Sequence, residues 1–217
     1  MKSKPITTLF FGLLLGSASL SCGQDKATPP QTNKSVKIGK QEWMAENLNV
    51  TRFRNGAPIP EAKTDEEWLK KKPAWCYYDN NPENGKKYGR LYNWFALTDK
   101  RGLAPQGWHI PTAKEWEALG STLGGIDQAG PKLKSASGWK NKGTNETGFS
   151  ALPGGVRYET GQFSEIGSMG IWWSSTENDP SGNMGHSLNG QNDWLGFFEG
   201  KANQTYGYSV RCVKDKK

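Results

Sequence analysis

Residues 107–119 read "GWHIPTAKEWEAL", and this stretch contains a complete signal for the start of a helix. Thr112 precedes the helical positions and Glu115 follows three residues later. This is the spacing of a capping box, in which each side chain bonds the backbone N–H of the other residue. Trp116 and Leu119 are three residues apart and therefore share one helix face. The stretch predicts a helix that begins after Thr112 and buries these two side chains.

The same stretch carries three reactive side chains, those of His109, Glu115 and Glu117. A carboxylate engaged with a helix N-terminus is held for stability, and the helix dipole lowers its proton affinity. Glu117 lies about 200° around the helix from Glu115, so the two carboxylates cannot share a substrate or a metal ion. The second histidine of the chain, His186, is distant in sequence. We therefore expect no catalytic residues here.

Two further features decide the predicted fold class. Residues 64–73, "TDEEWLKKKP", repeat the helix-start signal, with Thr64 as the cap and Glu67 three residues later. The second half of the chain is rich in Gly, Asn, Ser and Trp, and its short apolar segments between turn residues are typical of strands. We predict an α+β fold, with helices from the first half packed on a small, irregular, mostly antiparallel sheet built chiefly by the second half.

The N-terminus has the order of a secretory signal peptide: Lys2 and Lys4, a short apolar run, and small residues before Cys22. Its end resembles the lipobox of bacterial lipoproteins, where the signal is cut before a cysteine that is then acylated. We predict a signal peptide over residues 1–21, then a lipidated Cys22 and a disordered tether over residues 22–35. Several acyl chains anchor a protein stably. Secretion without a lipid is the alternative.

Composition limits both the core and the partners. Of the 217 residues only 34% are hydrophobic but ten are Trp, so we expect one compact domain, over residues 36–215, with an aromatic core. The net charge of +7 becomes +5 once Lys2 and Lys4 leave with the signal. Because this charge is modest and the lysines are spread along the chain, we expect no nucleic-acid partner.

If Cys22 is lipidated, Cys76 and Cys212 remain as an even pair in a compartment that permits oxidation. The sequence then predicts a disulfide between them, and two buried thiols are the alternative. Neither cysteine has a second cysteine or a histidine at the short spacing of a metal site. We predict no metal and no cofactor.

Six motifs occur in order along the chain: "WMAENLNV", "YGRLYNWFAL", "LAPQGWHIPTAKEWEAL", "GTNETGFSALPGGVRY", "GIWWSSTE" and "YGYSVRCVKD". Together, from about Val36 to Asp215, they resemble the Fibrobacter succinogenes major paralogous domain family. This resemblance implies a secreted or lipid-anchored bacterial surface protein. The family's biochemical function is not established, so it implies no reaction.

A more distant resemblance, over Pro111 to Trp116 and Tyr206 to Cys212, is to the formylglycine-generating enzyme family. That resemblance implies a fold related to the C-type lectin-like fold. The enzyme needs a pair of nearby redox-active cysteines, whereas Cys76 and Cys212 are far apart in sequence. Its oxidation chemistry is therefore not carried over.

The lectin comparison suggests that calcium and sugar bind at "GQNDWLGFF", where Asn192, Asp193 and Trp194 are adjacent. The lectin motif runs Trp-Asn-Asp, and the order is different here. No second segment of calcium ligands follows, so Asn192-Asp193 is interpreted as a turn before a strand, and calcium has little support.

The adjacent rings of Trp172 and Trp173 are the main candidates for a ligand platform, and Trp194 is the third. Neighbouring side chains of a strand point to opposite faces, so one ring is expected in the core and the other in solvent. An exposed indole suits a sugar or a peptide. Each of the three rings is alternatively a core residue.

The predicted function is a lipid-anchored protein of the bacterial envelope, in the outer membrane, facing the periplasm or the outside. Its domain is predicted to be a non-catalytic binding or adhesion module for carbohydrate or an envelope protein. An enzyme of unrecognised type and a purely structural envelope protein are the alternatives.

Overall fold

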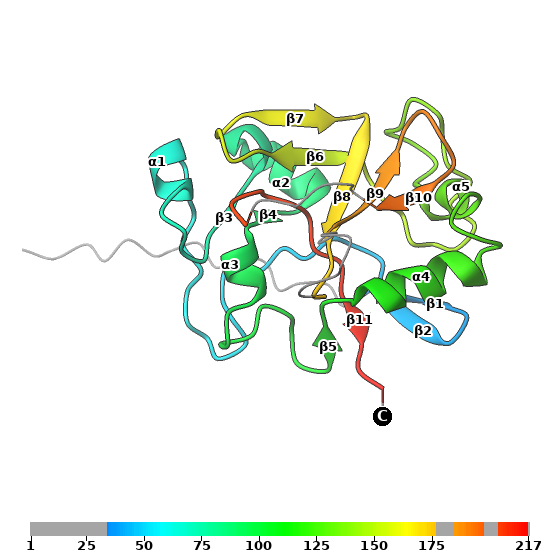
Figure 1. The fold of residues 1–217 in the computed structure, drawn as a ribbon, viewed down its shortest axis with the longest axis horizontal. Helices are drawn as coiled ribbons and strands as arrows, with labels where there is room; N and C mark the ends of the chain where they lie inside the picture. Colours follow the sequence, from blue (N-terminus) through cyan, green and yellow to red (C-terminus); the bar gives the residue numbers. More distant parts are fainter. Residues whose placement is uncertain (1–33, 177–184, 198–203, 217) are drawn as a thin grey trace, which may run out of the picture.

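The computed structural model describes residues 34–176, 185–197 and 204–216. Its elements are short (Figure 1). The helices are α1 (Asp65–Trp68), α2 (Pro82–Tyr88), α3 (Trp94–Leu97), α4 (Ala113–Thr122) and α5 (Ala129–Leu133), with a 3₁₀ turn, η1 (Tyr78–Asn80). The strands are β1 (Ser35–Ile38), β2 (Gln41–Met44), β3 (Trp75–Cys76), β4 (Leu91–Tyr92), β5 (Trp108–His109), β6 (Gly154–Arg157), β7 (Phe163–Ile166), β8 (Met169–Trp173), β9 (Gly185–Asn189), β10 (Leu195–Phe197) and β11 (Val213–Lys214).

The strands form small sheets in the orders β1-β2-β11-β5, β10-β9-β8-β6-β7 and β3-β4, so the α+β class is confirmed. The pairs are antiparallel except for β6 with β8. The prediction that the second half builds the sheet is wrong for the first of these sheets, because β1, β2 and β5 come from the first half. The end of the chain completes this sheet, since β11 pairs with β2 on one edge and β5 on the other.

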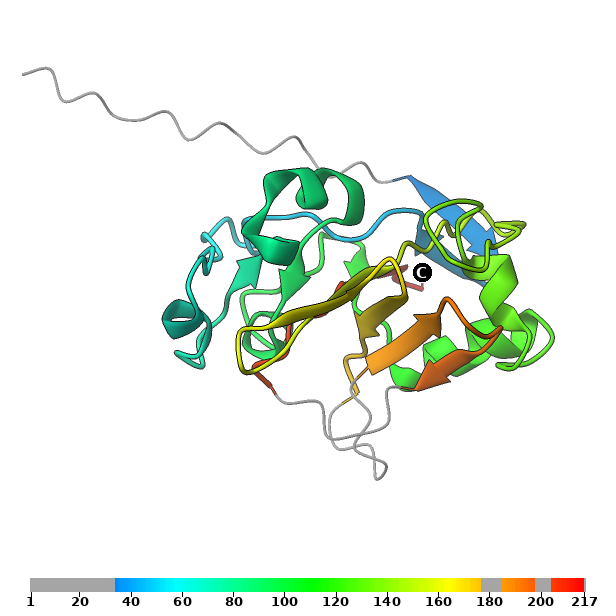
Figure 2. The same ribbon diagram turned by 90° about the horizontal axis from the view of Figure 1, so that it is seen from above.

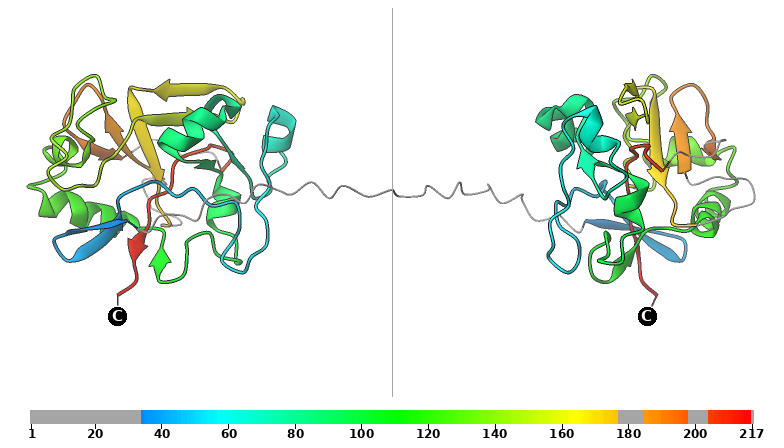
Figure 3. Two further views of the ribbon diagram at one scale, coloured as in Figure 1. Left: turned by 180° about the vertical axis from the view of Figure 1, so that it is seen from behind. Right: turned by 60° about the vertical axis from the view of Figure 1, so that its left-hand side comes forward.

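Residues 204–216 connect the sheets to one another. Figure 3 shows this red segment passing through the middle of the molecule before β11. Its isolated bridges are Tyr92 with Tyr208, Arg157 with Gly207, and Trp172 with Ser209. The C-terminal segment therefore contacts β4, β6 and β8 before it joins the first sheet, and the fold depends on contacts between residues far apart in sequence.

Both predicted capping boxes are confirmed. At α4, the hydroxyl of Thr112 accepts a hydrogen bond from the backbone N–H of Glu115 at 3.3 Å, and the Glu115 carboxylate accepts one from the Thr112 N–H at 2.9 Å. Thr64 and Glu67 make the same pair of bonds at α1. The buried face of α4 includes Trp116, as its spacing predicted. Local hydrogen bonding thus fixes where these helices begin.

Side chains from three of the sequence motifs meet at a buried polar site around Asn47. Its side-chain oxygen accepts from the Trp172 indole at 2.8 Å and from Arg211 Nε and Nη2 at 3.0 and 2.7 Å. Arg211 also donates to the carbonyls of Met44 and Phe149. Burial lowers the pKa of Arg211 to about 9. Amide and backbone carbonyl oxygens accept these hydrogen bonds, and the negative charge of Glu46 acts against the lowering of the Arg211 pKa.

The predicted disulfide is not formed: Cys76 and Cys212 are free, buried thiols. They belong to different parts of the core. Cys76 packs in a cluster with Trp68 and Tyr78, whereas Cys212 packs in the main cluster with Trp173 and its neighbours. Burial raises the pKa of both thiols to about 12. The prediction rested on the even number of cysteines, and it is wrong because the fold places the two thiols in different core clusters.

Candidate functional site

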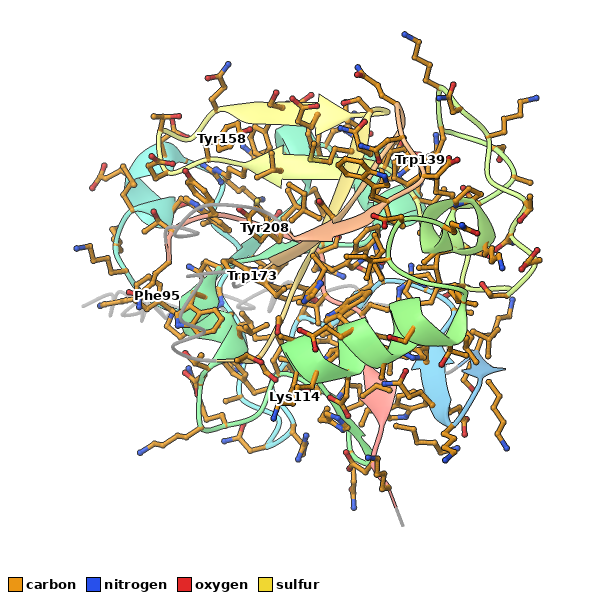
Figure 4. The ribbon with its side chains drawn as sticks, turned by 45° about the vertical axis from the view of Figure 1, so that its right-hand side comes forward. Phe95, Lys114, Trp139, Tyr158, Trp173 and Tyr208 are labelled. Atoms are coloured by element: carbon orange, nitrogen blue, oxygen red, sulfur yellow. The ribbon has the colours of Figure 1, made fainter. Side chains whose placement is uncertain are left out.

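The prediction that either Trp172 or Trp173 is exposed is wrong, because both rings are fully buried. The two side chains point to opposite faces of β8, as the strand geometry requires, but each face is covered by its own core cluster. Trp172 packs against Trp116 with ring centroids 6.3 Å apart, and Trp173 packs against Tyr208 at 4.4 Å. Figure 4 shows Trp173 and Tyr208 together in the interior. Neither ring is a ligand platform.

Trp194 is different from every other tryptophan in the chain. Trp194 is 57% exposed, whereas the other nine tryptophans are at most 6% exposed. It ends the connection between β9 and β10. The Asn192 side chain accepts a hydrogen bond from the Trp194 backbone N–H at 3.1 Å, which is the Asx turn that the Asn-Asp pair predicted. The third candidate is thus the one that the fold leaves accessible.

The loop that carries Trp194 is fixed on α5 and on the segment before it. Gly130 N–H donates to the Asp193 carbonyl at 2.8 Å, and Leu195 N–H donates to the Ile126 carbonyl at 2.8 Å. A Cβ at Gly130 would lie 2.4 Å from the Asp193 oxygen, so glycine is required for this approach. These bonds hold both sides of Trp194, and the indole is presented by ordered backbone.

A buried lysine completes this support. Lys134 is 1% exposed, and its Nζ donates to the Asn192 carbonyl at 2.5 Å, inside the turn that orients Trp194. Its Nζ also lies 5.4 Å from the centre of the buried Trp139 ring. Burial lowers the pKa of Lys134, and the Asp193 carboxylate acts in the opposite direction. The lysine therefore holds the loop from the buried side, and Trp194 lies on the exposed side of the loop.

Beside Trp194 the side chain of Ile126 is also exposed, at 38%. Gln191 and Asp193 are exposed on the same loop. We call these four residues the Trp194 surface. It combines a large apolar ring with amide and carboxylate groups, which is the composition of sites that take ligands with both apolar and hydroxyl-bearing faces.

A second group of aromatic side chains was missed by the sequence analysis. Tyr158 and Tyr206 are partly exposed, and their rings meet edge to face with centroids 5.5 Å apart and planes at 78°. They are brought together because Arg157 and Gly207 exchange two backbone hydrogen bonds, of 3.1 and 2.8 Å. The pairing joins segments about fifty residues apart, and no local sequence signal indicates it.

His109 lies between two carboxylates, that of Glu115 from its own stretch of sequence and that of Asp215 from the end of the chain. Its Nδ1 is 2.8 Å from Asp215 and its Nε2 is 3.0 Å from Glu115. Burial acts to raise the pKa of Glu115, but hydrogen bonds from the Thr112 backbone and from His109 outweigh it and lower the pKa. Because both ring nitrogens have carboxylate partners, the imidazole links β5, α4 and the C-terminal segment. His186 is buried elsewhere, stacked on Trp116.

Two general properties of the described residues bear on the chemistry. Over residues 34–176, 185–197 and 204–216, no cluster of three or more His, Cys, Asp or Glu side chains is arranged to hold a metal ion. In the same part of the chain, no helix has the length and apolar character needed to cross a membrane. Cys22 and the predicted signal and tether lie outside the described residues, apart from Lys34 and Ser35.

The family model of the Fibrobacter succinogenes major domain matches residues 36–214, which is nearly the whole described fold. No curated protein and no solved structure matches the chain. The matched range includes the buried Asn47 site, both capping boxes and the Trp194 loop. The chain therefore belongs to the Fibrobacter succinogenes major domain family.

Proposed function

We propose that this protein is anchored by lipid in the bacterial cell envelope and that its domain binds carbohydrate without catalysing a reaction. The observation that carries the proposal is the exposed indole of Trp194 on a fixed loop. Exposed apolar area costs about 25 cal/mol per Å², so the fold forgoes stability by leaving this ring in solvent. An exposed indole on a hydrogen-bonded loop, with polar side chains exposed on the same loop, supports a binding surface.

The chemistry of the Trp194 surface favours a sugar. A pyranose has a face of C–H groups that packs on an indole, and its hydroxyls bond polar side chains around the ring. Asp193 and Gln191 supply such groups beside Trp194. Because the loop is already ordered by backbone hydrogen bonds, little conformational entropy is lost when a ligand binds. An envelope protein that packs on the same ring is the competing outcome.

The geometry of the domain fits an anchor at Cys22. Figure 2 shows the blue β1, the first strand after the tether, on one side of the molecule and the orange β9 and β10 on the opposite side. An anchor that joins the domain at β1 would therefore leave β9 and β10 on the far side of the domain from the point of attachment (Figure 2). The proposed location is the outer membrane, with the domain in the periplasm or outside. Protease treatment of intact cells distinguishes these two sides.

The finer assignment of a C-type-lectin-like fold is part of the same proposal. Small irregular sheets, flanking helices and a loop-rich second half support it. The start of α4 within Pro111 to Trp116 supports it as well, because that segment carries the resemblance to the formylglycine-generating enzyme family.

Binding is tested with the full chain, purified in an uncharged detergent and applied to a glycan array with and without calcium. Trp194→Ala should weaken binding at least about tenfold, since losing a stacked aromatic ring removes about 1.5–3 kcal/mol. Leu69→Ala is the matched control, because Leu69 is also an exposed apolar residue, 46% exposed, just after α1 at the far end of the molecule from β10 (Figure 1). An array without any retained glycan, or normal binding by Trp194→Ala, would contradict the proposal.

The anchor is tested by Cys22→Ser. The variant should remain as uncleaved or soluble precursor, because only the cysteine accepts the lipid, and mass spectrometry of the wild-type N-terminal peptide should show the acyl groups. Unchanged partitioning of the variant into detergent would remove the lipid from the proposal and leave simple secretion.

A further inference from the structure

The Tyr158–Tyr206 pair forms an ordered aromatic corner at the surface, distinct from the Trp194 surface. The rings stand nearly perpendicular, at 78°, and both residues are partly exposed. Behind them Tyr206 contacts the buried Tyr208, with centroids 5.9 Å apart, and Tyr208 packs on Trp173. The backbone bonds between Arg157 and Gly207 fix both strands. The corner is therefore built on the core and does not need to form when a ligand arrives.

Among the residues that the structure describes, those whose charges act on this corner are carboxylates. Burial raises the pKa of the Tyr158 hydroxyl, and the carboxylates of Glu165 and Glu159 raise it further. For Tyr206 the causes are burial and then the Glu159 carboxylate, which accepts a hydrogen bond from the hydroxyl. The two aromatic rings of this corner therefore lie within the electrostatic influence of two carboxylates.

The neighbouring guanidinium does not neutralise this corner. Arg157 directly precedes Tyr158, so its side chain points to the other face of the strand. There it donates to Asp65 at 2.7 Å and lies under the rings of Trp68 and Phe163, 4.7 and 5.0 Å from their centres. Its charge is thus committed to a carboxylate on the far side.

We propose that the Tyr158–Tyr206 corner binds an alkylammonium group. The π face of a tyrosine attracts a cation, and perpendicular rings with an adjacent carboxylate surround such a group on several sides. A cation is attracted by the charge of the carboxylates, which a neutral sugar is not, and an anion is repelled by them. The same ammonium chemistry occurs in an amino-lipid headgroup and in a lysine side chain.

The test uses the full chain in uncharged detergent and ligand-observed NMR. Choline is compared with 3,3-dimethylbutan-1-ol, which has the same shape without the charge. Choline should bind at least about fivefold more tightly, the ratio expected from a cation–π contribution of about 1 kcal/mol. Glu159→Gln keeps an acceptor for Tyr206 but removes the charge, so it should reduce choline binding severalfold without unfolding the domain.

Two further measurements identify the molecule that carries the ammonium group and show whether this corner acts independently of the Trp194 surface. Phosphoethanolamine and an Nα-acetyl-lysine amide represent the headgroup and the peptide, and whichever binds more tightly identifies the source. Trp194→Ala should leave choline binding unchanged, so failure of the carbohydrate proposal does not affect this one. Equal binding of choline and its neutral analogue, or unchanged choline binding by Glu159→Gln, would overturn the proposal.

Discussion

Replacing Asn47 with alanine should test the buried polar site more sharply than any change at the surface. The variant removes the acceptor of the Trp172 indole and of two Arg211 nitrogens, and leaves the Tyr88 carbonyl without the 2.9 Å bond from the Asn47 amide. An unpaired buried polar group costs about 1–3 kcal/mol, and a charged one costs more. We expect a loss of about 3–5 kcal/mol in the free energy of unfolding.

The assay is urea unfolding at neutral pH, read as a shift of the midpoint at constant slope. Asn47→Asp is the matched variant, because it keeps the acceptor oxygens and adds a countercharge for Arg211 while losing the amide donor. It should therefore lose less stability than Asn47→Ala. A loss below about 1 kcal/mol for alanine, or equal losses for the two variants, would refute the role assigned to this side chain.

Three other changes have defined outcomes. Thr112→Ala should lower stability by about 1 kcal/mol through the lost helix cap, measured by urea unfolding, and a helix start supported by other contacts would show no change. Trp173→Ala should cost about 3–5 kcal/mol by the same assay, because it empties the core and leaves the Tyr92 carbonyl without its 2.6 Å bond; near-neutral stability would contradict the packing described. The free energy of unfolding should fall as the pH rises from about 9 to about 12. The thiols of Cys76 and Cys212 have a pKa of 9.0 in the unfolded chain and about 12 when buried. The native state therefore holds more protons than the unfolded state over this range, and raising the pH favours unfolding. Cys212→Ala should make this fall shallower, whereas a disulfide-bonded protein would show no thiol contribution.

The features that could be predicted from the sequence are those that short segments determine by themselves. The capping boxes at Thr64 and Thr112 and the turn at Asn192 each depend on bonds between residues two or three positions apart. The free thiols and the position of β11 between β2 and β5 depend on which distant segments meet, and no local pattern encodes that.

The candidate site shows the same division. Alternation along β8 correctly separated Trp172 from Trp173, but whether a face of a strand meets solvent depends on the rest of the fold, and here both faces are covered. Trp194 ranked third because its sequence context is a turn, yet that turn keeps the ring out of the core. The Tyr158–Tyr206 pair was missed because its pairing is not local.

The buried Asn47 site also indicates which part of the domain tolerates changes of side chain. Asn47, Trp172 and Arg211 come from three of the six motifs and bond one another in the interior, so a change at any of them acts on stability first. The Trp194 loop lies between the last two motifs. Its hydrogen bonds to α5 and to Ile126 join backbone N–H and carbonyl groups, which are the same for most residue types. Side chains on the outer side of this loop are therefore free to change at little cost to the scaffold, whereas Gly130 and Lys134 beneath it are not.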